Sequence, residues 1–151
     1  MSKEDFDDTV YTLSQLYDEL PKQLIHRDVH FGNFLFDQGT FSGYIDFDLS
    51  QRNIRIFDIA YFLLGLLADK EYNRLSDDSW LIIVQETIRG YEEYISLLDY
   101  EKIALPTVMK CIELLFVAYF TNERDPARAK DAADIFNFVL THNEIIRDNC
   151  K

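Results

Sequence analysis

Two short polar segments hold side chains that could carry out chemistry together. The first runs from Ile25 to Asn33 and reads IHRDVHFGN, and the second is Asp46-Phe47-Asp48. Asp28 and Asn33 lie five residues apart across a glycine-containing loop, and Asp46 follows thirteen residues later. If the intervening residues form a hairpin, its return brings these three oxygen-bearing side chains to one place.

This set of two carboxylates and one amide suits a hard, oxygen-seeking cation such as Mg²⁺. In phosphoryl transfer, one carboxylate positions and deprotonates the attacking hydroxyl, and other oxygens hold magnesium on the nucleotide phosphates. Asp28 and Asn33 could instead be turn residues that bond backbone amides. Asp46, however, ends an apolar strand, where a carboxylate is costly without a function. The pattern therefore predicts a metal-dependent phosphotransfer site.

The same residues resemble a known family. The pattern His-x-Asp-x-x-x-x-Asn, followed by Ile-Asp-Phe, is similar to the catalytic loop and metal-binding segment of the kinase-like superfamily. It resembles in particular the aminoglycoside phosphotransferase and choline kinase branch of small-molecule kinases. Asp58-Ile59-Ala60-Tyr61 also resembles the Asp-Leu-Ala signature of that branch.

Two features separate the chain from protein kinases. His30 stands where protein kinases usually place a lysine, and the eleven residues between Asp46 and Asp58 are too few for an activation loop. The resemblance therefore implies a small-molecule kinase that uses ATP and Mg²⁺ as cofactors. Its acceptor would be a hydroxyl group on an aminoglycoside-like or other small molecule, with cationic compounds among the options.

The resemblance also implies roles for individual residues. Asp28 corresponds to the catalytic base, and Asn33 and Asp46 correspond to the magnesium ligands. His26 matches a residue that packs beneath the metal loop and hydrogen-bonds to backbone, so we expect it to be a structural support.

Three further residues each have two possible roles. His30 either supports the loop or contacts the phosphate or substrate as a cofactor-binding residue. Asp48 either helps to hold magnesium through water or caps a turn. Asp58 either caps its helix or braces the catalytic loop through hydrogen bonds.

Hydrophobic spacing predicts a mostly helical α+β domain, a kinase-like C-terminal lobe with about five helices and one β-hairpin that carries the metal loop. The hairpin joins residues 34–36 and 41–45 through a turn. We interpret the stripe that contains Trp80, Val84, Tyr91 and Tyr94 as core. The helices are expected at 6–20, with Phe6 and Val10 inward; at 56–68; at 80–98; after Pro106, with Tyr119 inward; and from Pro126, capped by Asp125.

We expect residues 1–151 to form a single domain that lacks the N-terminal nucleotide-binding lobe of the family. Only 27 residues precede Asp28, and they include neither a glycine-rich loop nor a lysine in a strand context. Three origins are compatible with this expectation: a fragment of a longer phosphotransferase, a truncated gene product, or one half of a two-chain enzyme.

Composition argues against other classes of protein. Lys and Arg total 15 against 27 Asp and Glu, a net charge of −12, and a nucleic-acid binder needs a basic face instead. The most apolar stretch, from Ile56 to Ala68, is too short for a membrane span. The first residues lack the apolar run of a signal peptide, and Cys111 and Cys150 do not imply a disulfide framework, so we expect a cytoplasmic protein.

As a lone lobe, the chain is expected to be an incomplete or inactive phosphotransferase. The alternative function is a degenerate kinase lobe that acts as a binding or assembly module. The face that a missing lobe would cover is rich in phenylalanine, so we also expect self-association, most simply as a homodimer. The residues concerned are Phe31, Phe34, Phe36 and Phe41.

Overall fold

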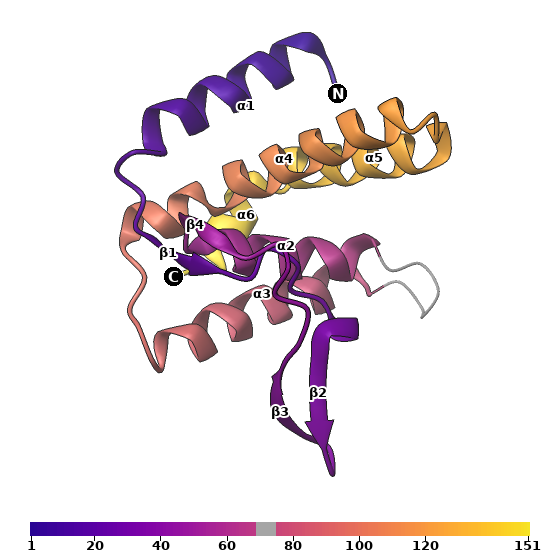
Figure 1. Ribbon diagram of the computed structural model, residues 1–151. Helices are drawn as coiled ribbons and strands as arrows, with labels where there is room; N and C mark the ends of the chain where they lie inside the picture. The colour runs from indigo at the N-terminus through magenta and orange to yellow at the C-terminus, as the bar shows by residue number, and fades with distance from the viewer. Residues whose placement is uncertain (69–74) are drawn as a thin grey trace.

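The computed structural model describes residues 1–68 and 75–151, which form a helical body with one projecting hairpin (Figure 1). The predicted mostly helical α+β class is confirmed. Within the described ranges there are six α-helices, one more than expected, because a short helix follows the last predicted one. They are α1 (Lys3–Leu16), α2 (Ile56–Ala68), α3 (Asp77–Glu92), α4 (Asp99–Asn122), α5 (Pro126–Thr141) and α6 (Asn143–Asp148).

Helix α4 is the centre of the helical body. It packs against α1, α2, α5 and α6, and Figure 1 shows it running alongside α5. We predicted a helix that starts after Pro106, but α4 begins at Asp99 and contains Pro106. The proline removes one backbone hydrogen bond, and burial of the flanking Leu105 and Val108 in the core offsets that loss. Tyr119, predicted to face inward, is exposed.

By length and composition, α4 could cross a membrane, with a mean hydropathy of 1.7 over its most apolar window. More than half of that window is buried inside the protein, however. The helix also carries the buried ionisable residues Glu101, Lys110 and Glu113. Its apolar composition is therefore that of a core helix packed on several sides.

Helices α1 and α3 differ from their predicted faces or ends. In α1 the residues that face α4 are Thr9, which is buried, and Leu13 and Leu16, which pack on the core. Phe6 and Val10 are exposed, because α4 covers only one edge of the wide apolar stripe. Helix α3 ends at Glu92 rather than continuing to residue 98.

The core interpretation of the stripe on α3 is confirmed for Trp80 and Val84, which are fully buried. It is wrong for Tyr94, which is 87% exposed because α3 ends at Glu92, before that residue. The indole nitrogen of Trp80 donates a hydrogen bond of 2.9 Å to the carbonyl of Leu63, so its one polar atom is satisfied. Asp125 caps α5 as predicted, since its carboxylate accepts a hydrogen bond from the backbone N–H of Arg128.

The strands form two antiparallel pairs. The predicted hairpin is β2 (Phe34–Asp37) with β3 (Thr40–Tyr44), and it projects from the helical body in Figure 1. Its turn contains Gly39, whose positive φ of 82° favours glycine. The second pair, β1 (Lys22–Ile25) with β4 (Gln51–Ile54), was not predicted, because the sequence of β4 is polar and lacks alternation.

A buried ion pair ties the start of α2 to the start of α4. The guanidinium of Arg55 donates to both carboxylate oxygens of Glu101, at 2.8 and 2.6 Å, and also to the carbonyl of Ser96 at 2.9 Å. The carboxylate of Glu101, which is 0% exposed, accepts a further hydrogen bond from the backbone N–H of Leu98. The pair thereby fixes the strand pair β1–β4 against the helical core.

We expect Glu101→Gln to lower the free energy of unfolding by about 3 kcal/mol, because it leaves the largely buried Arg55 without its counter-charge. Urea denaturation would measure the change. Glu86→Gln, which breaks an exposed pair with Arg89, is the control and should cost less than about 0.5 kcal/mol. Equal effects of the two substitutions would contradict a structural role for the buried pair.

Candidate active site

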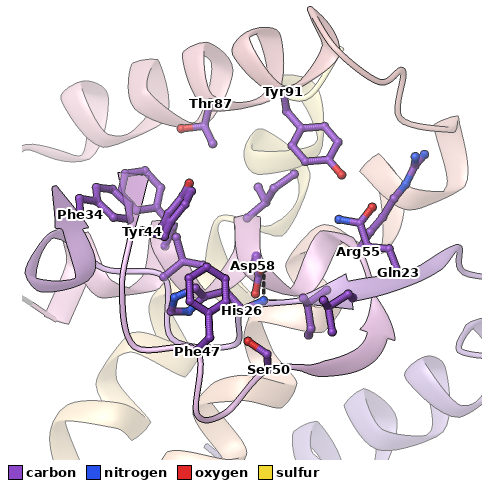
Figure 2. A pocket seen from close by; sticks show the side chains of 15 residues that line it. Gln23, His26, Phe34, Tyr44, Phe47, Ser50, Arg55, Asp58, Thr87 and Tyr91 are labelled. Carbon is purple, nitrogen blue, oxygen red and sulfur yellow. Dashed lines mark hydrogen bonds between the residues drawn. The ribbon is translucent and has the colours of Figure 1, made fainter. Parts of the chain in front are cut away.

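The carboxylate of Asp58 holds the backbone of the predicted catalytic loop. From the first turn of α2, Asp58 accepts a hydrogen bond of 2.8 Å from the backbone N–H of His26 (Figure 2). It accepts a second, also of 2.8 Å, from the backbone N–H of Arg27. Arg27 has a φ of 72°, in the left-handed region that non-glycine residues rarely adopt. The two hydrogen bonds thus act where the loop backbone is strained, and they offset the cost of that conformation.

His26 connects this loop to the segment that carries Asp46. Its Nδ1 accepts a hydrogen bond from the backbone N–H of Asp28 at 3.3 Å, so the ring proton resides on Nε2 and is donated to the carbonyl of Ile45 at 2.8 Å. The buried ring also packs on Phe47, with 4.6 Å between ring centroids. His26 therefore lies beneath both segments of the site and contacts each of them.

The structure brings Asp28 and Asn33 together. The amide nitrogen of Asn33 donates to the Asp28 carbonyl at 2.9 Å and to its carboxylate Oδ2 at 3.0 Å. Asn33 ends the single 3₁₀ turn Phe31–Asn33, and its carbonyl accepts a hydrogen bond from the backbone N–H of Ile45 at 3.0 Å. The same side chain thus orients the carboxylate of Asp28 while its backbone holds the end of the hairpin.

Tyr61 is a contact of Asp28 that the sequence analysis did not single out. Its hydroxyl donates a hydrogen bond of 2.8 Å to Oδ1 of Asp28. Burial, this hydrogen bond, and the negative charges of Asp28 and Glu113 all raise the pKa of Tyr61 well above its usual value. The tyrosine therefore remains a neutral hydrogen-bond donor to the carboxylate.

His30 begins the 3₁₀ turn beside the same carboxylate. Its Nδ1 accepts a hydrogen bond from the backbone N–H of Gly32 at 3.1 Å, and its Nε2 lies 3.5 Å from Oδ2 of Asp28. A Cβ atom at Gly32 would lie only 2.7 Å from the His30 ring, so this position needs glycine for close approach. His30 supports the loop through one ring nitrogen and presents the other to the site.

Asp46 and Asp48 are exposed and follow the hairpin. Asp46 has a φ of 63°, and it comes directly after Ile45, whose backbone is bonded to both His26 and Asn33. The backbone that carries Asp46 is therefore fixed next to Asn33. Asp48 lies two residues further along, in the exposed segment before β4.

The donor atoms fit a magnesium ion that completes its shell with phosphate and water. The amide nitrogen of Asn33 is used by Asp28, so its Oδ1 is the atom that can bind a cation. Asp46 adds carboxylate oxygens. Residues 1–68 and 75–151 contain no group of three or more His, Cys, Asp or Glu side chains able to hold a metal. Mg²⁺ is usually bound by one or two protein oxygens plus substrate phosphates, so this sparse set suits it.

A cavity of about 440 Å³ opens beside the carboxylate of Asp28. Residues of the catalytic loop, α2, α4 and α5 line it, and they include aromatic rings and several charged groups. Its lining residues are Asp28, His30, Tyr61, Leu64, Gly65, Ala68, Glu113, Phe116, Phe120, Arg128, Asp131, Ala132 and Ile135.

Glu113 is the unusual member of this lining. It is only 3% exposed, and none of the residues that the structure describes donates a hydrogen bond to it. Removal from water raises the pKa of its carboxyl group to about 8. The sequence analysis missed it because Glu113 lies in a long apolar helix, and its burial depends on how that helix packs.

A second cavity, of about 420 Å³, lies among the side chains drawn in Figure 2. His26, Phe47 and Asp58 line it together with Thr87 and Tyr91 of α3. Asp28 does not line this cavity. The space that can hold a reacting group beside Asp28 is therefore the first cavity.

Comparisons with known proteins agree with this arrangement. The model of the phosphotransferase enzyme family matches residues 3–105. Two homoserine kinases are similar to the chain over 99 residues: that of Zymomonas mobilis is 27% identical over 66% of this chain, and that of Phenylobacterium zucineum is 32% identical over 64% of it. The matched segments are only 29% and 28% of those kinases, so the chain spans less than a third of their length.

A solved structure, amicoumacin kinase hAmiN in complex with AMP-PNP, Ca²⁺ and Ami, shares the fold. The two superpose with a TM-score of 0.65 at 21% sequence identity, over 98% of this chain and 46% of the kinase. The kinase-like fold predicted from the sequence is thus confirmed across almost the whole chain.

We expect Asp58→Asn to destabilise the loop by about 1–3 kcal/mol, because an amide NH₂ replaces an oxygen that accepts from a backbone N–H. Hydrogen exchange of the His26 and Arg27 amides should accelerate, and chemical denaturation would measure the loss in stability. Asp18→Asn, at an exposed position, is the control. Unchanged exchange at both amides would show that Asp58 does not hold the loop.

The pKa of Glu113 predicts a specific pH dependence of stability. The folded protein keeps the Glu113 proton up to about pH 8, whereas the unfolded chain releases it near pH 4.5. The free energy of unfolding is therefore not reduced by this group below pH 4.5, and it falls as the pH rises towards 8. Glu113→Gln removes this loss. Between pH 4.5 and 8, the free energy of unfolding of the variant should therefore rise relative to that of the parent by up to about 1.4 kcal/mol per pH unit. If the free energies of unfolding of the parent and of Glu113→Gln, measured by chemical denaturation, changed with pH in the same way, the raised pKa of Glu113 would be contradicted.

Proposed function

Because the chain belongs to the phosphotransferase enzyme family, we propose that its site is that of an ATP-dependent kinase that phosphorylates a hydroxyl group on a small molecule. One observation carries the proposal. The carboxylate of Asp28 is oriented by Asn33 and Tyr61 and lines a cavity of about 440 Å³. That arrangement suits a group that receives a proton from a bound alcohol.

In this reaction the acceptor hydroxyl lies in the cavity and donates its hydrogen bond to Asp28. As its oxygen forms a bond to the γ-phosphorus of ATP, the bond from that phosphorus to ADP breaks and the hydroxyl proton passes to Asp28. Asn33 and Tyr61 each occupy one lone pair of the carboxylate, so a further lone pair remains for the alcohol. Their role is to keep the carboxylate in one orientation.

Asn33 Oδ1 and the carboxylate of Asp46 are the atoms that would hold Mg²⁺, and Asp48 would act through water. The ion, when bound, neutralises charge on the nucleotide phosphates. His30 keeps two roles in the proposal: its Nδ1 supports the loop, and its Nε2–H is available to a phosphate oxygen. None of these side chains supplies an adenine pocket.

We expect Asp28→Asn to lower turnover by about two to four orders of magnitude in the protein completed with a nucleotide-binding lobe, because the amide cannot accept the proton. A phosphate-transfer assay with a panel of alcohols would measure this. Asp99→Asn, at the exposed start of α4, should leave turnover unchanged. If the Asp28 variant were as active as the parent, Asp28 would not be the base.

The lone 151-residue chain should bind ATP·Mg²⁺ weakly, since nucleotide affinity in this fold is shared between two lobes. It should also self-associate, because the hairpin exposes the large apolar side chains of Leu35, Phe36 and Phe41. Calorimetric titration and light scattering would measure both properties. Micromolar binding of the nucleotide by a strictly monomeric chain would overturn this expectation.

A further inference from the structure

The cavity of about 420 Å³ in Figure 2 is not lined by Asp28 and lies outside the space assigned to the acceptor. We propose that it is a second binding site, which takes a neutral aromatic compound with one N–H or O–H group. Its occupation stabilises the segment that carries Asp46. This proposal concerns binding and the backbone of the folded chain, so it does not depend on the proposed phosphotransfer.

Most of the lining is aliphatic or aromatic, which favours an apolar ligand, and the volume is within the range of small-molecule sites. Figure 2 shows Thr87 and Tyr91 extending from α3 towards the residues of the catalytic loop. The other walls come from β1, the hairpin, the residues around Phe47, and α2. The apolar and aromatic members are Leu24, Ile25, Val29, Phe34, Tyr44, Phe47, Ile59, Phe62 and Tyr91.

The charged side chains of the lining, Asp58 and Arg55, already have partners. Both oxygens of the Asp58 carboxylate accept hydrogen bonds from backbone N–H groups of the loop. The guanidinium of Arg55 is bonded to Glu101 in the buried ion pair. A charged ligand would lose its hydration without meeting an unpaired counter-charge in this lining, so the cavity favours a neutral compound.

Ser50 gives the cavity a polar group that a ligand can satisfy. Its Oγ is buried and has no hydrogen-bond partner among the described residues. A buried hydroxyl without a partner is costly, and native structures usually satisfy such groups. Thr87 and Tyr91 add two further hydroxyl groups to the lining, and a hydroxyl oxygen can accept from an N–H or O–H donor. The ligand is therefore an aromatic compound that carries one such donor.

A ligand in this cavity would contact Phe47, whose side chain is 56% exposed and packs on the ring of His26. His26 donates a hydrogen bond to the carbonyl of Ile45, directly before Asp46. A compound that contacts Phe47 in this position binds an arrangement without that contact less well, so its binding favours the observed one. Occupation of the cavity thereby stabilises the backbone that carries Asp46.

The test uses three probes on the 151-residue chain: indole, benzofuran, which has an oxygen in place of the N–H group, and indole-5-carboxylate, which is charged. Chemical-shift titrations would give the Kd of each. We expect indole to bind with a Kd below about 1 mM. It should bind about fivefold more tightly than benzofuran, which lacks the hydrogen-bond donor. Indole-5-carboxylate should bind at least about tenfold more weakly than indole.

Variants assign the binding to this cavity. Ser50→Ala should abolish the preference for indole and leave the Kd of benzofuran unchanged. Thr87→Phe places a ring in the cavity and should abolish binding of both probes. The matched control is Gly65→Leu, which adds bulk to the cavity beside Asp28 and should change neither Kd. A Cβ at Gly65 meets no atom within 4 Å, and unfolding curves would establish that each variant is folded.

Hydrogen exchange tests the effect on the segment that carries Asp46. Saturating indole should slow exchange of the Ile45 amide, which donates to the carbonyl of Asn33, by at least about threefold. The Ala129 amide, near the start of α5, should exchange at the same rate with and without indole. In Thr87→Phe, indole should change neither rate.

Absence of saturable shifts with indole would overturn the proposed site. So would binding that Gly65→Leu abolishes and Thr87→Phe leaves unchanged, because the probe would then occupy the cavity beside Asp28. Tighter binding of indole-5-carboxylate than of indole would contradict the neutral class of ligand. If indole bound without slowing exchange of the Ile45 amide, occupation of the cavity would not stabilise the Asp46 segment.

Discussion

The arrangement of the site depends on one carboxylate that binds two consecutive backbone amides. Asp58 accepts from the N–H groups of His26 and Arg27, where the loop passes through a left-handed conformation that a non-glycine residue does not adopt without compensation. Tyr61 follows three residues later on the same face of α2 and donates to Asp28. One turn of a core helix thus holds both the backbone of the loop and the side chain at its centre.

Three carboxyl groups that are withdrawn from water are accommodated in three different ways: Glu101 and Glu113 are buried, and Asp58 is half-buried. Glu101 has a guanidinium and a backbone amide as partners, and Asp58 has two backbone amides. Glu113 has neither among the described residues, although it is almost as buried as Glu101. Since desolvation is costly for every carboxylate, the first two are explained by the contacts that fix the fold. The third meets this cost in another way: its pKa is raised to about 8, so its carboxyl group stays mostly protonated at neutral pH.

Local chemistry made much of the fold predictable. The apolar stretch from Ile56 to Ala68 placed α2 at its observed residues, Asp125 followed by Pro126 marked the start of α5, and a turn-forming tetrapeptide marked the hairpin. These signals depend on neighbours within a few residues. The predictions were wrong where tertiary packing overrides these local signals. Helix α4 continues through Pro106 because its surroundings are apolar on several sides, and β4 is a strand only because β1 pairs with it.

For the site, the sequence by itself singled out Asp28, Asn33 and Asp46 as candidates, because they fall in two short contiguous motifs whose residue types and spacing suit phosphotransfer. The contact between Asp28 and Asn33 spans only five residues and follows from the loop. The tertiary structure alone decided that Tyr61 is bonded to Asp28 and that Glu113 lines the same cavity. Periodicity shows that a helix has a buried face, but which polar side chain on that face meets a cavity depends on the packing of helices that are distant in sequence.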